Sequence, residues 1–156
     1  MNAVLTAAQQ AELARGGSLV RTMPPMAQRA SVRTKLGKSR MLADALSVRE
    51  VAELLGVSDS RIRQRAVGRS LLVIRATEGL RFPRFQFPDD AELPGWDQVA
   101  PHFPAEAHPV GVARFMQTPI VDLEIEGEPV TPIQWLVEGG SPHAVADLVD
   151  GAHLIA

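Results

Sequence analysis

The apolar positions of residues 47–66 predict two short helices joined by a glycine turn. In the stretch "VAELLGV" (51–57), the first valine and the two leucines lie at positions i, i+3 and i+4, which is the spacing of one helix face. Gly56 is placed to end this helix, because glycine adopts the left-handed conformation at a helix C-terminus without steric cost. Ile62 and Ala66 then repeat one turn apart, so a second helix is expected to turn this side inward.

Capping residues mark where both of these helices begin. Ser47 is followed three residues later by Glu50, the spacing of a reciprocal capping box. Ser58 is a second N-cap candidate, and Asp59 places a negative charge in the first turn, where it complements the helix dipole. A helix, a three-residue turn around glycine and a second helix predict a helix-turn-helix.

After the second helix, the period changes from helical to extended. Leu71–Arg75 is a β-branched and aliphatic run, "ATEG" supplies a turn, and Leu80–Phe87 begins by alternating apolar and basic residues. Pro83 is expected to confine the second strand to a sheet edge, since proline has no N–H to donate. This hairpin is typical of a wing, and residues 42–88 are therefore predicted to form a winged helix-turn-helix.

Three further parts complete the predicted organisation. Residues 1–41 mix Gly, Pro, Ser and cations and are expected to form a basic, partly flexible arm. Residues 89–108 are acidic and proline-rich, so we expect a connector with one helical turn near Trp96–Val99. Residues 109–156 carry short capped helical patterns, one of them opened by Thr131–Gln134, and predict a small helical domain. The expected fold class is mainly α with a small β-hairpin wing.

Composition and charge narrow the function. The chain has 156 residues and no cysteine, which excludes disulfides and thiolate chemistry. It has no apolar run long enough for a membrane helix and no signal-peptide pattern, so a soluble cytoplasmic protein is expected. Up to residue 88 there are fifteen Lys/Arg and six Asp/Glu, a net +9, whereas from residue 89 there are one and twelve, a net −11. The first part is thus the candidate for contact with a polyanion.

Residues of the second helix and of the hairpin are the candidate DNA contacts. With Ile62 inward, a rotation of 100° per residue turns one set of side chains outward, where Gln and Arg can read base edges in the major groove: Ser60, Arg61, Arg63 and Gln64. A second set is expected to contact phosphates beside the groove: Arg75, Arg81 and Arg84. A single module of this size binds weakly, so a homodimer that reads two half-sites is expected.

Two stretches carry a family resemblance. Residues 46–87, with "VAELLGVS" and the ending "RFPRFQF", resemble the excisionase-like, MerR-related winged helix-turn-helix of actinobacterial type. Residues 112–149, with "TPIQWLVEGG", are similar to the C-terminal domain of MbcA/ParS/Xre antitoxins, although Phe115 and Met116 stand where that family has Trp-Leu and an acidic "DLEIEGE" is inserted. The resemblance implies an autoregulating repressor that binds a toxin through its C-terminal helices, with Phe115, Met116, Trp135 and Leu136 as candidate partner contacts.

Other functions stay open beside this one. The chain is alternatively a protein-interaction module with a basic half that binds an acidic partner, or a nucleoid-associated DNA-binding protein without a toxin. An enzyme is not expected, because His102 and His108 lie six residues apart in an irregular segment and no glycine-rich phosphate loop occurs. We accordingly expect no cofactor and no metal ion.

Overall fold

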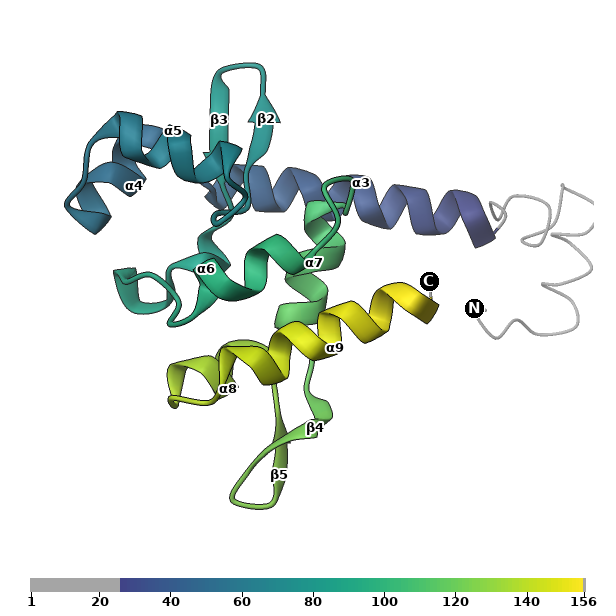
Figure 1. Cartoon of the computed structure of the whole chain (residues 1–156). Helices are drawn as coiled ribbons and strands as arrows, with labels where there is room; N and C mark the ends of the chain where they lie inside the picture. Colours follow the sequence, from purple (N-terminus) through teal and green to yellow (C-terminus); the bar gives the residue numbers. More distant parts are fainter. Residues whose placement is uncertain (1–25, 156) are drawn as a thin grey trace, which may run out of the picture. The chain divides into compact units, whose positions relative to one another are not determined.

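The computed structural model describes residues 26–155 and contains helices and two small antiparallel sheets (Figure 1). The chain divides into two units, Met1–Gly37 and Lys38–Ala156. The first 25 residues of the predicted basic arm lie outside the described residues. In order, the helices and strands are α3 (Met26–Asp44), β1 (Leu46–Ser47), α4 (Val48–Leu55), α5 (Asp59–Val67), β2 (Ile74–Ala76), β3 (Gly79–Phe82), α6 (Trp96–Val99), α7 (Pro109–Met116), β4 (Ile120–Ile125), β5 (Glu128–Val130), α8 (Pro132–Val137) and α9 (Pro142–Ile155). Three 3₁₀ turns cover Arg84–Gln86, Pro88–Asp90 and Ala100–His102.

Helix α3 shows that part of the predicted basic, partly flexible arm of residues 1–41 is helical. Its sequence lacks a clear amphipathic pattern, which is why periodicity missed it. It is nevertheless rich in Ala, Arg, Lys, Leu and Met, which lose little conformational freedom in a helix. The preceding pair of prolines, Pro24 and Pro25, fits a helix start immediately downstream.

The first sheet has three strands in the order β1-β3-β2, so β3 is its central strand. The prediction that Pro83 would place this strand at an edge was therefore wrong. Leu46 pairs with Phe82 and Ser47 with Arg81, which adds a two-residue strand on the far side of β3. Pro83 lies one residue beyond the end of β3, and its missing N–H removes no hydrogen bond from the ladder.

Strand β2 is also shorter than expected, because a side chain replaces part of the predicted ladder. The amide of Gln86 accepts a hydrogen bond from Leu72 N–H at 2.7 Å and donates one to Leu72 C=O at 2.9 Å. Both backbone groups of Leu72 are thereby satisfied without a partner strand.

The second sheet corrects the prediction of an all-helical C-terminal domain. Strands β4 and β5 pair in antiparallel fashion, with Ile125 opposite Glu128, and the turn residues Glu126 and Gly127 both have positive φ, 53° and 82°. Two consecutive residues with positive φ are the mark of a type I′ hairpin turn. The acidic insert "DLEIEGE" is thus part of a second hairpin. The two hairpins leave the helical part of the unit at opposite ends (Figure 1).

One hydrophobic core runs through the unit Lys38–Ala156, including the segment expected to be a connector. Leu93, Trp96, Val99 and Phe103 are buried in the same cluster as residues of α4, α5, α7, α8 and α9. The predicted helical turn Trp96–Val99 is confirmed. Because these apolar residues are spaced irregularly between prolines, their burial was not visible as a period in the sequence. Residues from Leu46 to Val149 therefore contribute to one packed core.

Candidate nucleic-acid interface

The predicted helix caps around α4 and α5 are confirmed. Ser47 Oγ accepts from Glu50 N–H at 3.1 Å, and Glu50 Oε1 accepts from Ser47 N–H at 2.8 Å. Gly56 ends α4 at φ 69°, and Ser58 Oγ accepts from Arg61 N–H at 3.1 Å at the start of α5. These bonds satisfy amide groups that a helix end leaves without intrahelical partners, and they fix where α5 begins.

Helix α5 has one buried and one exposed face. Ile62 is completely buried in the core cluster that also contains Val51 and Ala52 of α4. The four side chains predicted to read bases are all exposed: Ser60, Arg61, Arg63 and Gln64. The packing of Ile62 therefore fixes the rotation of the helix, and a short polar and cationic face is presented to solvent.

Arg65 on the same helix has a structural role. Its Nη1 and Nη2 donate to the two carboxylate oxygens of Glu92 at 2.6 and 2.7 Å, and its Nε donates to Ser70 Oγ at 3.0 Å. Its side chain is only 12% exposed. The hydrogen bonds that Arg65 donates to Glu92 are the largest cause of its raised pKa, and the coulombic attraction of Glu92 adds to it. This paired arginine holds α5 to the segment before α6.

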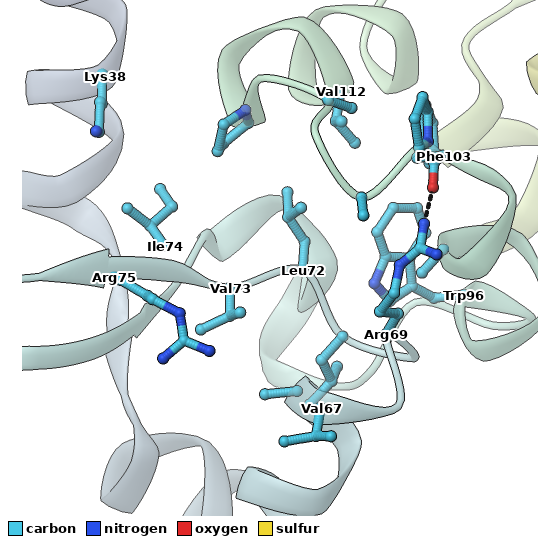
Figure 2. Close-up of a pocket in the computed structure, with 17 residues that line it drawn as sticks. Lys38, Val67, Arg69, Leu72, Val73, Ile74, Arg75, Trp96, Phe103 and Val112 are labelled. Carbon is cyan, nitrogen blue, oxygen red and sulfur yellow. Dashed lines mark hydrogen bonds between the residues drawn. The ribbon is translucent and has the colours of Figure 1, made fainter. Parts of the chain in front are cut away.

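Arg69 is likewise used within the molecule. Its guanidinium donates to the carbonyl oxygen of Phe103, and to that of Pro101 at 3.4 Å (Figure 2). The residue itself adopts φ 63°, which is uncommon for a residue with a Cβ. Sequence reasoning assigned no role to Arg65 or Arg69, because Glu92, Pro101 and Phe103, which accept from them, lie 27 to 34 residues away and no local pattern connects them.

The three hairpin arginines differ in how accessible they are. Arg75 on β2 is exposed and makes no side-chain hydrogen bond or ion pair with the residues that the structure describes. Arg81 is half-buried, and its Nη1 donates to Leu80 C=O at 2.9 Å. Arg84 lies 3.9 Å from an Asp44 carboxylate oxygen and 3.7 Å from one of Asp90. Of the three, Arg75 is best placed for a phosphate, whereas Arg84 already faces two carboxylates.

Two of the four candidate partner contacts are buried within the chain, and the other two, Phe115 and Trp135, are half-buried. Met116 and Leu136 are completely buried, at 0% and 1% exposure. Phe115 packs edge-on against Phe103, with ring centroids 5.6 Å apart. Trp135 donates from Nε1 to Ser141 C=O at 3.0 Å. An apolar pattern on a short helix indicates burial, and here the burial is within the chain itself.

The ring of Trp135 lies directly over a glycine. A Cβ added to Gly140 would lie 2.4 Å from the ring, so only glycine lets the backbone pass beneath it. The exposed large apolar side chains of the C-terminal part are instead Val121 on β4 and Val137 on α8.

Comparisons with known proteins give no indication of function, so a functional proposal has to be based on the geometry of the site. No family model, curated protein or solved structure matches this sequence. Within residues 26–155, no helix has both the length and the apolar character needed to cross a membrane.

Proposed function

We propose that the protein binds double-stranded DNA as a sequence-specific transcriptional regulator, with α4, α5 and the β2–β3 hairpin acting as a winged helix-turn-helix. The observation that carries the proposal is the division of α5 between fully buried Ile62 and the exposed set Ser60, Arg61, Arg63 and Gln64. An α-helix fits the major groove, where glutamine pairs with adenine and arginine with guanine.

Charge supports the same orientation. The cations of the interface lie in the part of the chain with a net +9, and the acidic part begins only at residue 89. A polyanion is attracted to the first and repelled by the second, so the helix α5 side would face DNA. Arg75 on the adjacent hairpin would contact a phosphate and fix the register without reading sequence.

The test is fluorescence anisotropy of the full chain on DNA from upstream of its own gene and on scrambled DNA of equal length, at two salt concentrations. Gln64→Ala should reduce the preference for the specific site, with little change in the salt dependence. Arg75→Ala should weaken both DNAs alike and lower the slope of log affinity against log salt by about one.

Arg114→Ala is the matched control, since Arg114 is also exposed but lies on α7 in the acidic part. It should change neither quantity. Equal binding by wild type, Gln64→Ala and Arg75→Ala would reject the groove model and favour the protein-interaction alternative.

Autoregulation, homodimers and a toxin partner remain predictions from the sequence. A partner on the C-terminal part would have to contact side chains other than buried Met116 and Leu136, and exposed Val121 and Val137 are available for this. Binding to DNA would place the protein in the cytoplasm with the nucleoid.

A further inference from the structure

A pocket of about 600 Å³ lies beside the β2–β3 hairpin (Figure 2). Its walls come from the C-terminal end of α5, the segment leading into β2, and the region of α6 and α7. Leu72 and Val112 lie on facing sides of the space, whereas Lys38 and Arg75 stand at one end and Arg69 at the other. The volume is in the range of sites that hold small organic molecules.

The lining has an unusual chemical composition. Of the seventeen lining residues, three are cationic, namely Lys38, Arg69 and Arg75, and the other fourteen are Ala, Val, Leu, Ile, Pro, Phe or Trp. The lining contains neither an acidic nor an uncharged polar side chain. A second cavity, next to Arg65, is lined by Glu92 and Asp97 together with arginines, so it does not share this bias.

Two hydrogen-bonded groups hold the pocket walls in place. The buried side chain of Gln86 bonds both backbone groups of Leu72 and accepts from Trp96 Nε1 at 2.7 Å. Arg69 donates to the carbonyl oxygen of Phe103 at the same end of the pocket. Leu72, Trp96, Phe103 and Arg69 all line the pocket, so its shape is set before any ligand enters.

We propose that this pocket binds a small apolar organic anion, such as an aromatic carboxylate. Apolar walls favour a hydrocarbon body, because its burial removes apolar surface from water. The charges at the two ends are all positive, so a carboxylate is favoured over a neutral or cationic group of the same size. The proposal does not rest on DNA binding, because it concerns the pocket lining alone.

The test uses 2-naphthoate as the probe and isothermal titration calorimetry with the full chain, without DNA. Saturable binding of one 2-naphthoate per chain is expected, with uncharged 2-naphthamide at least about tenfold weaker, the loss that one charged hydrogen bond accounts for. No binding of 2-naphthoate, or equal binding of the two compounds, would overturn the proposal.

Two pairs of matched variants locate the site. Val67→Glu adds a negative charge to a lining residue that is 80% exposed, and Val121→Glu adds one to a valine outside the pocket that is 75% exposed. Arg75→Ala and Arg114→Ala form the second pair. The first member of each pair should weaken 2-naphthoate binding about tenfold, and the second should leave it unchanged.

All four substituted side chains are exposed, so the variants should keep the fold, which the unchanged circular dichroism spectrum and melting temperature would verify. If the two members of each pair weakened binding equally, or if none did, the ligand would bind elsewhere and the assignment to this pocket would be wrong.

Discussion

The two hairpins of the unit Lys38–Ala156 are held in different ways. The β2–β3 hairpin gains a third strand from β1 and is fixed to α6 through the fully buried amide of Gln86. The β4–β5 hairpin has two strands only and is anchored through Leu123, which is 1% exposed, with a change of register between Ile120 and Glu124. The first hairpin thus adds a polar network to the burial of Phe82 and Ile74, whereas the second relies on apolar burial and turn geometry.

The two hairpins also differ in whether the charged side chains around them form ion pairs. Around the first hairpin, several charged groups are paired internally, as Arg65 is with Glu92 and Arg84 with Asp44 and Asp90. The acidic residues of β4 and its turn have no ion-pair partner among the described residues. Exposed cations near the first hairpin such as Arg75 therefore have no ion-pair partner among the described residues.

The largest expected effect is the loss of the Gln86 network. Gln86→Leu keeps the side-chain volume similar but leaves the Leu72 backbone groups and Trp96 Nε1 without their partners. Each buried polar group without a partner costs about 1 to 3 kcal/mol, and because Leu72 is only half-buried we expect a total loss of about 3 kcal/mol. Urea unfolding measures it.

Gln98→Leu is the control for this change, because Gln98 is an exposed glutamine on α6. Its free energy of unfolding should stay within about 0.5 kcal/mol of wild type. If both variants lost the same free energy of unfolding, the hydrogen bonds of Gln86 would not be what stabilises the first hairpin.

The local signals in the sequence were sufficient for caps and helix faces, but not for long-range pairing. Ser47, Glu50 and Gly56 lie within ten residues of one another, so their roles follow from spacing, and the inward turn of Ile62 follows from periodicity. Gln86 and Leu72 are fourteen residues apart, and Arg65 and Glu92 twenty-seven, and nothing in the intervening sequence relates them. The exposed face of α5 was therefore predictable, whereas the walls of the pocket were not.

The β4–β5 hairpin is an instructive omission. Its turn "EG" at Glu126 and Gly127 is a two-residue connection between runs that contain valine, leucine and isoleucine, which is a hairpin signal. The density of acidic residues conceals it, because Asp and Glu are depleted in strands. A strand with only one buried position can carry such charges without loss of pairing.

The second effect concerns the ion pair of the first region. Glu92→Gln keeps the shape of the side chain but leaves Arg65, which is 12% exposed, without a charged partner. We expect a loss of about 1 to 2 kcal/mol, below that of a fully buried pair, because Glu92 is 27% exposed and water screens the interaction. The matched change Asp122→Asn on β4 should cost less than about 0.5 kcal/mol. If thermal unfolding showed the same loss of stability for both variants, the ion pair would not distinguish the first hairpin from the second.

The third effect tests the turn of the second hairpin. Gly127→Ala should destabilise by about 1 kcal/mol, because φ is 82° there and an L-residue is strained at positive φ. No atom lies within 4 Å of the added Cβ, so any loss is conformational and not due to a clash. Glu126→Asn should act in the opposite direction, since asparagine tolerates positive φ better than glutamate. Changes of the same sign in the melting temperatures of the two variants would contradict a type I′ turn at this position.

The smallest effect distinguishes the two capping boxes by pH. Glu50 closes the box of α4, and its hydrogen bonds with the backbone and side chain of Ser47, helped by Arg84 and Arg81, lower its pKa from 4.5. Because the pKa is lower in the folded state, this stabilisation is complete above the unfolded pKa and is lost as the pH falls through the folded one. In α8 the equivalent position is Gln134, whose Oε1 accepts from Thr131 N–H at 2.9 Å and does not titrate.

Placing Gln at position 50 should therefore remove the pH dependence of the α4 capping box, and placing Glu at position 134 should introduce it into that of α8. Glu50→Gln should flatten the fall in the urea midpoint between about pH 7 and about pH 3.5, and Gln134→Glu should steepen it. Both changes should be smaller than that of Gly127→Ala, because solvent screens these exposed carboxylates. The difference between each variant and wild type isolates one box from the other carboxylates of the chain. A wild-type slope in both variants would mean that neither box contributes to the acid sensitivity of the fold.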